Sequence, residues 1–160
     1  MFVLLFMIMA ILIFIILLIT SSSPGKLPSL KDDQGRNIEG SFCEKIWIEV
    51  NGMKQGMFIR GENRNNPVLL YLHGGPGTPM LQFISYLEEN HRLEKYFTIC
   101  YWDQRGSGMT YYKDTDASTM TLHQMVEDTL EVTKYLKRRF QIEKIYLLGH
   151  SWGSYLGVKT

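Results

Sequence analysis

The segment Gly149-His150-Ser151-Trp152-Gly153 constrains the fold of this chain most, because it directly follows the short apolar run at residues 145–148. A strand that feeds a Gly-x-Ser-x-Gly turn and then a helix holds its serine on a sharp, strained bend. Bulk on either side of that serine would collide with the strand or the helix, which explains the two glycines. The pattern therefore predicts that Ser151 presents its Oγ at a strand end as a candidate nucleophile.

Two more glycine-rich segments follow predicted strands. Residues 73–77, His-Gly-Gly-Pro-Gly, come after the apolar run 68–72, and residues 103–108, Asp-Gln-Arg-Gly-Ser-Gly, come after the run 97–102. The carboxyl ends of parallel strands meet at one edge of a sheet, and ligands bind in the crevice there. We therefore expect all three segments to lie together at that edge.

Each segment contributes candidate site residues. The backbone amides of Gly75 and Trp152 are candidates for an oxyanion hole beside Ser151, because one donor follows the nucleophile and the other comes from the loop after an earlier strand. Gly74, Asp103 and Arg105 are candidates for substrate contact. A loop-bracing role is favoured for Asp103 and Arg105, since such side chains commonly satisfy nearby backbone groups.

Together, residues 73–77, 103–108 and 149–154 resemble the proline iminopeptidase (prolyl aminopeptidase) group of α/β-hydrolases. The resemblance extends from Phe42 to Thr160. It implies an α/β-hydrolase fold and a serine peptidase that removes N-terminal residues from peptides, or a relative that acts on amides or esters. The expected partner is therefore a peptide or a small amide or ester substrate.

The catalytic acid and base of this fold follow the serine, in the order Ser, then Asp or Glu, then His. Residues 152–160 contain neither an acid nor a histidine. We expect an incomplete α/β-hydrolase fold that runs through the nucleophile turn and has negligible turnover alone. A non-catalytic membrane-bound binding module and an esterase of the same fold stay open as alternatives. Epoxide and haloalkane chemistry is disfavoured, because those relatives need an aspartate where Ser151 stands.

Residues 1–19 are all apolar, and a helix of this length spans roughly 30 Å, the thickness of a bilayer core. We expect residues 1–20 to form a single-pass transmembrane anchor. A cleaved signal peptide is disfavoured, because the run is long and has no basic start. The nearby basic residues Lys26, Lys31 and Arg36 follow the run, which favours a cytoplasmic domain, and the opposite topology stays open.

The remaining chain divides into two parts. Residues 21–40 lack apolar periodicity and are predicted to be a linker, and residues 41–160 are predicted to be the N-terminal part of the hydrolase domain. Asn51-Gly52 predicts a tight hairpin between strands 42–50 and 53–61. Helical spacing of apolar residues predicts helices over 79–96 and 121–140. In the second helix Thr121 and Gln124 have capping-box spacing, and acids at 127, 128 and 131 precede bases at 134 and 137–139, as the helix dipole favours.

Several functions are excluded or disfavoured. The net charge of +1 and the dipole-matched basic run give no reason to expect nucleic-acid binding. We expect no metal and no cofactor, because no two histidines have a spacing that presents them together on one element. His73 is expected to brace its loop, and none of the four histidines is well placed as the base. Cys43 and Cys100 are expected to be small buried groups in strands.

Overall fold

The computed structural model describes the backbone of residues 2–21, 27, 29–84 and 92–160, and their side chains except those of residues 2–5, 18–21 and 82. Five strands form one sheet in the order β1-β2-β4-β3-β5. The strands are β1 (Phe42–Val50), β2 (Met53–Gly61), β3 (Val68–Leu72), β4 (Thr98–Trp102) and β5 (Tyr146–Gly149). β2 pairs antiparallel with β1 and β4, whereas β3 pairs parallel with β4 and β5, so the sheet is mixed.

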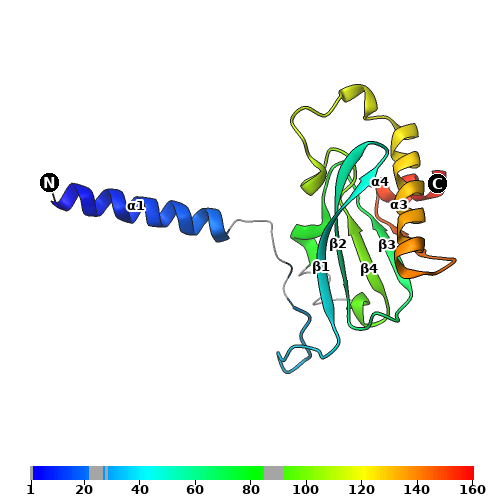
Figure 1. Cartoon of the computed structure of the whole chain (residues 1–160), viewed down its shortest axis with the longest axis horizontal. Helices are drawn as coiled ribbons and strands as arrows, with labels where there is room; N and C mark the ends of the chain where they lie inside the picture. The colour runs from blue at the N-terminus through cyan, green and yellow to red at the C-terminus, as the bar shows by residue number, and fades with distance from the viewer. Residues whose placement is uncertain (1, 22–26, 28, 85–91) are drawn as a thin grey trace.

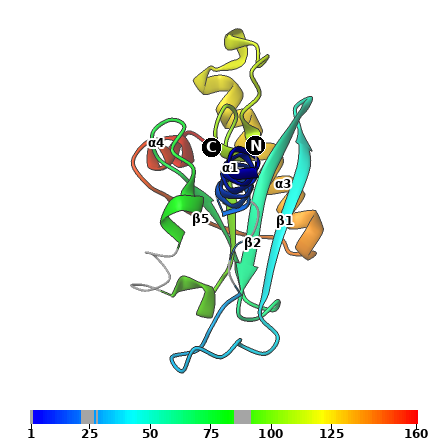
Figure 2. The same cartoon turned by 90° about the vertical axis from the view of Figure 1, so that its left-hand side faces the viewer.

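The predicted hairpin is confirmed. Asn51 and Gly52 connect β1 to β2 and both have positive φ, as a two-residue hairpin turn of this kind requires. Pairing runs without interruption from Val50↔Met53 to Phe42↔Gly61. The hairpin forms one end of the sheet, and β5 forms the other (Figure 2).

Two helices pack on the sheet, α3 (Leu122–Phe140) and α4 (Trp152–Lys159). α3 lies along one face (Figure 1) and is capped as predicted, because the Thr121 side chain accepts a hydrogen bond from the Gln124 amide at 3.2 Å. Within α3, Asp128 is fully buried, and so are Met125 and Val132 on the same side of the helix. The acid thus faces the sheet and not water.

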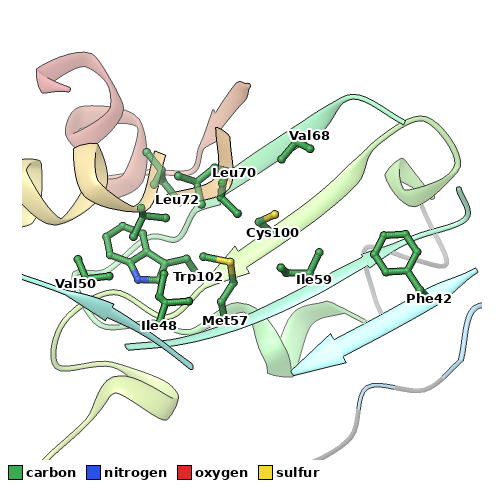
Figure 3. Packing of buried hydrophobic residues seen from close by; sticks show 12 residues of the cluster. Phe42, Ile48, Val50, Met57, Ile59, Val68, Leu70, Leu72, Cys100 and Trp102 are labelled. Atoms are coloured by element: carbon green, nitrogen blue, oxygen red, sulfur yellow. The ribbon is translucent and has the colours of Figure 1, made fainter. Parts of the chain in front are cut away.

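The core has two layers because β3 and β4 are buried on both faces. Alternate side chains of the strands pack under α3 (Figure 3), and this cluster contains Phe42, Ile48, Val50, Met57, Ile59, Val68, Leu70, Leu72, Cys100, Trp102, Val132 and Leu136. The other side chains form a second cluster on the opposite face, which contains Phe58, Leu69, Tyr71, Met80, Ile84, Ile99 and Tyr101. β5 differs from its neighbours, because Tyr146, Leu147 and Leu148 are exposed.

Between residues 79 and 96 the structure differs from the single predicted helix. Short 3₁₀ turns occupy Met80–Phe83 and Leu93–Lys95. The rest of the predicted helix, residues 85–91, lies outside the described residues. Short 3₁₀ turns also follow β4, at Gly108–Thr110 and Ala117–Thr119.

The N-terminal residues form the helix α1 (Phe2–Ser21), which lies apart from the sheet (Figure 1). Its described side chains, residues 6–17, include large apolar groups that are all exposed. Within the described part of the chain, no helix combines the length and the apolarity needed to cross a membrane. The membrane-spanning role expected for residues 1–20 is therefore not shown.

The second half of the predicted linker is folded locally. The Ile38 amide donates to the Leu30 carbonyl, Lys31 bridges Asn37, and Leu30 is buried. The expectation for the cysteines was right for Cys100, which is buried, and wrong for Cys43, which is exposed on β1. Because neighbouring residues of a strand face opposite sides, Cys43 points away from the cluster that buries Phe42.

Candidate active site

Ser151 lies between β5 and α4 and has φ 53° and ψ −117°, a backbone conformation that side-chain-bearing residues seldom adopt. The sharp turn leaves the residue exposed at the strand end. Gly153 permits this turn, because a Cβ at residue 153 would collide with the carbonyl oxygen of Leu72. The His150 amide donates to the same oxygen at 3.1 Å and ties the turn to β3.

The loop after β3 lies against Ser151. A Cβ added to Gly74 would be 3.3 Å from the Cβ of Ser151 and 2.9 Å from His150 Nδ1, so only glycine fits here without displacing the turn. Gly75 has φ 115°, which also favours glycine. The predicted meeting of segments 73–77 and 149–153 therefore occurs.

These two segments share a cavity of about 290 Å³. Its lining is mostly apolar and consists of Tyr71, Gly74, Gly75, Thr78, Met80, Phe83, His150 and Ser151. Trp152 is the first residue of α4, a position whose amide has no partner within the helix. Ser151 and Gly75 thus face one cavity, and the Trp152 amide begins the helix beside it.

His73 braces the loop, as the sequence suggests. The ring is buried; its Nε2 accepts from the Gln104 amide at 3.1 Å, and its Nδ1 is 2.9 Å from the Gly74 carbonyl oxygen. An amide can only donate and a carbonyl can only accept, so the proton is assigned to Nδ1. Burial lowers the pKa of His73 below its ordinary value, which favours this neutral ring.

Gln104, which was not among the predicted site residues, connects three segments. Its side-chain Nε2 donates to the His73 carbonyl at 3.1 Å, and its Oε1 accepts from the Trp152 indole Nε1 at 3.0 Å. Its position between Asp103 and Arg105 was the only sequence signal. An isolated glutamine in a loop does not reveal its partners.

Asp103 and Arg105 are held by other protein groups. The Asp103 carboxylate accepts from the Met109 amide at 2.8 Å, and burial raises its pKa to about 6. Arg105 donates to both carboxylate oxygens of Asp128, at 2.8 and 3.1 Å. Neither residue lines the cavity at Ser151, and their contact with substrate stays a prediction.

Asp128 is the second residue that the sequence interpretation missed. Its buried carboxylate accepts from Asn51, Gln55 and Gln124 as well as from Arg105. It therefore joins the β1–β2 turn, β2, α3 and the loop after β4. A signal was present, because Asp128 has helical spacing to Met125 and Val132 on the apolar face.

The other histidines lie differently. His150 lines the cavity beside Ser151, His123 is exposed on α3, and His91 lies outside the described residues. Among the residues that the structure describes, no group of three His, Cys, Asp or Glu side chains could hold a metal ion.

Known proteins resemble this chain over the same region. A probable aminopeptidase of Bacillus subtilis (strain 168), YbaC, is 43% identical over 111 residues, which cover 69% of this chain and 34% of the relative. Esterase EstD of Thermotoga maritima is 28% identical over 158 residues, which cover 87% of this chain and 36% of the relative. This chain thus spans about a third of the length of these curated relatives.

A solved structure agrees with the sequence matches. The proline iminopeptidase-related protein of Thermus thermophilus superposes with a TM-score of 0.57 at 28% identity, over 74% of this chain and 39% of that protein. Residues 67–159, more than half of this chain, match the model of the alpha/beta hydrolase fold family. The chain therefore belongs to the α/β-hydrolase family, and its resemblance is to members of the proline iminopeptidase type.

Proposed function

We propose that this chain carries the nucleophile and the oxyanion hole of a serine hydrolase that cleaves N-terminal residues from peptides. The observation that carries the proposal is the shared cavity of Ser151 and Gly75, with Ser151 on a strained turn. Ser151 Oγ would attack the substrate carbonyl carbon and pass its proton to a base. The Gly75 and Trp152 amides would stabilise the negative oxygen of the tetrahedral intermediate, and each such donor is typically worth about 3 kcal/mol.

The cavity supports a substrate whose acyl group carries an apolar side chain. Tyr71, Met80 and Phe83 provide apolar walls beside Ser151, and burial raises the pKa of the Tyr71 phenol, which keeps it neutral. An aminopeptidase activity is supported by the similarity to the probable aminopeptidase of B. subtilis. The similarity to esterase EstD supports an ester-cleaving enzyme as the second candidate.

A base and an acid are also required. No residue from 152 to 160 can supply either group, and Nε2 of His73 is occupied by the Gln104 amide. We propose that a polypeptide of residues 1–160, assayed by itself, has negligible turnover. A non-catalytic binding module with this fold would be inactive in every form of the protein.

The first test compares the unaltered protein with its Ser151→Ala variant, both purified as the complete product of the native reading frame. We expect hydrolysis of an aminoacyl arylamide to be lost, because no other group attacks the carbonyl, whereas Ser118→Ala, at an exposed site in a 3₁₀ turn, should leave the rate unchanged. Aryl esters and arylamides compared side by side separate the esterase from the aminopeptidase. Full activity in Ser151→Ala would contradict the proposed nucleophile. Serine-dependent turnover by residues 1–160 alone would contradict the proposal that this polypeptide has negligible turnover.

We also propose that α1 anchors the protein in a membrane as a single pass. The support is the uninterrupted apolar sequence of residues 1–19 and the exposure of the described apolar side chains from Phe6 to Leu17. The basic residues after the helix support a cytoplasmic hydrolase domain. The substrate would then be processed close to a membrane surface.

A further inference from the structure

Gln104 lies where three segments meet. Its side chain is 1% exposed and uses both of its polar atoms, one toward His73 and one toward Trp152. The backbone amide of Gln104 donates a second hydrogen bond to His73, at the ring Nε2. The loop after β4 is thereby joined to the loop after β3 and to the beginning of α4.

The two segments held by Gln104 are those that carry the proposed oxyanion donors. Gly75 follows His73 by two residues, and the Trp152 amide belongs to the residue whose indole is bound. Oxyanion donors act only when both lie about 3 Å from the same developing charge, so their separation must be held closely. The His150–Leu72 backbone bond gives one fixed point, and Gln104 gives a second on the side of the indole.

The backbone of Gln104 is also held in place by neighbouring residues of its loop. The Ser107 hydroxyl donates to the Gln104 carbonyl at 2.7 Å, and the Ser107 amide donates to the same oxygen at 2.9 Å. The next residue, Arg105, is bound by the buried carboxylate of Asp128 on α3. The position of the Gln104 side chain therefore follows from the packing of α3 on the sheet.

The chemistry of the amide group explains why glutamine suits this site. A carbonyl oxygen of His73 needs a donor, and the indole N–H of Trp152 needs an acceptor. Glutamine offers both on one planar group, whereas glutamate would present only acceptors and leucine neither. The His73 carbonyl oxygen would then be left unpaired at a buried site and the Trp152 indole N–H at a partly buried one.

We propose that Gln104 is a positioning residue that sets the distance between the Gly75 and Trp152 amides and so supports the transition state. The inference rests on the proposed serine hydrolase function. It differs from that function in naming a residue that does not contact the substrate. It also assigns the Trp152 side chain a purpose separate from that of its backbone amide.

The test compares Gln104→Leu, Trp152→Phe and the double variant in the same gene product, with an aryl ester as substrate. We expect each single variant to lower kcat by about 10- to 100-fold with KM within about twofold, because a misplaced donor weakens only the transition state. The double variant should be no worse than the single variants, since both remove the same bond. Hydrogen exchange should quicken at residues 73–77 and 149–153 in Gln104→Leu.

The chain offers a matched control in a second buried glutamine–tryptophan pair. Gln55 Oε1 accepts a hydrogen bond from the Trp102 indole at 2.8 Å. Neither residue of this pair lines the cavity at Ser151. Trp102→Phe, which removes this bond and leaves the Gln55 bond to Asp128 in place, should lower the free energy of unfolding as Trp152→Phe does, yet keep kcat of the folded protein within about threefold. A purely structural role for Gln104 would make the two variants alike.

The outcomes are distinguishable. Unchanged kcat in either single variant, or an equal loss in Trp102→Phe, would overturn this inference while leaving the proposed hydrolase intact. Absence of Ser151-dependent hydrolysis in the unaltered gene product would refute the proposed function, and this inference with it. A loss of kcat confined to the Gln104 and Trp152 variants, with faster exchange at both segments, would support it.

Discussion

At the scale of single residues, burial determines how readily the Asp103 carboxyl group ionises. Its carboxyl group is 4% exposed and accepts a hydrogen bond from the Met109 amide. Burial disfavours the ionised form and raises the pKa from an ordinary value of 3.8 to about 6. The folded protein therefore holds this proton to a higher pH than the unfolded chain does.

This difference predicts how stability depends on pH. A carboxyl whose pKa is raised in the fold contributes stability below about pH 3.8, and that stability is lost as the pH rises toward about 6. A pKa difference of about two between the folded and the unfolded protein corresponds to about 3 kcal/mol in the free energy of unfolding. Asp103→Asn, which stays neutral and can still accept from Met109, should therefore be more stable than the unaltered protein at pH 7.5 and not at pH 4.

Urea unfolding at the two pH values measures the effect. The exposed Asp114→Asn serves as control and should show no such pH-dependent difference. If Asp103→Asn is equally destabilised at both pH values, the ionised carboxylate is needed and the argument from burial is wrong.

At the scale of elements, β5 stands apart from the other strands. Among the strands that the structure describes, it pairs only with β3. Three of its four residues are exposed, whereas every residue of β3 and β4 is buried. An edge strand with unpaired backbone groups and apolar side chains is a template for association with another strand. The strand that positions Ser151 is thus also the least protected strand of the sheet.

We expect a polypeptide of residues 41–160 to associate with increasing concentration, as measured by light scattering. Leu147→Lys should reduce the association, because a charge on an edge strand opposes pairing with a second chain. Val158→Lys, at the most exposed large apolar residue of α4, is the matched control for added charge. An equal reduction by the two substitutions would indicate general hydrophobic association instead.

The whole molecule contains an apolar helix and a hydrolase sheet, and the structure describes residues 27 and 29–41 of the connection between them (Figure 1). Part of that connection packs on the domain through the buried Leu30. If α1 is an anchor, the hydrolase domain would be held near the surface of a bilayer. The edge of the sheet that carries Ser151 would then lie within reach of substrates at that surface.

Deletion of residues 1–20 tests this arrangement. The unaltered protein should sediment with membranes and resist extraction by alkaline carbonate, because the proposed anchor would bury the uninterrupted apolar sequence of residues 1–19 in the bilayer core. The deleted form should appear in the supernatant and keep its activity. Extraction of the unaltered protein by carbonate would show that the helix does not span the bilayer.

Much of this arrangement can be predicted from the sequence because it depends on local rules. Asn51-Gly52 encodes the turn between β1 and β2, the apolar runs encode β3, β4 and β5, and Thr121 encodes the start of α3. Glycines at 74 and 153 indicate the close approach of two loops to Ser151. Each of these features depends on a few neighbouring residues, so its signal survives in the sequence.

Only the tertiary structure decided how polar side chains far apart in the chain pair inside the fold. Asp128 and Arg105 lie 23 residues apart, and Gln104 and Trp152 lie 48 apart. Each of these polar side chains could equally face solvent if the chain packed differently. The identity of a polar residue therefore does not reveal its partner in the fold. The sequence determined a serine on a strained turn between glycine loops, and the packing of α3 and α4 on the sheet determined what holds those loops together.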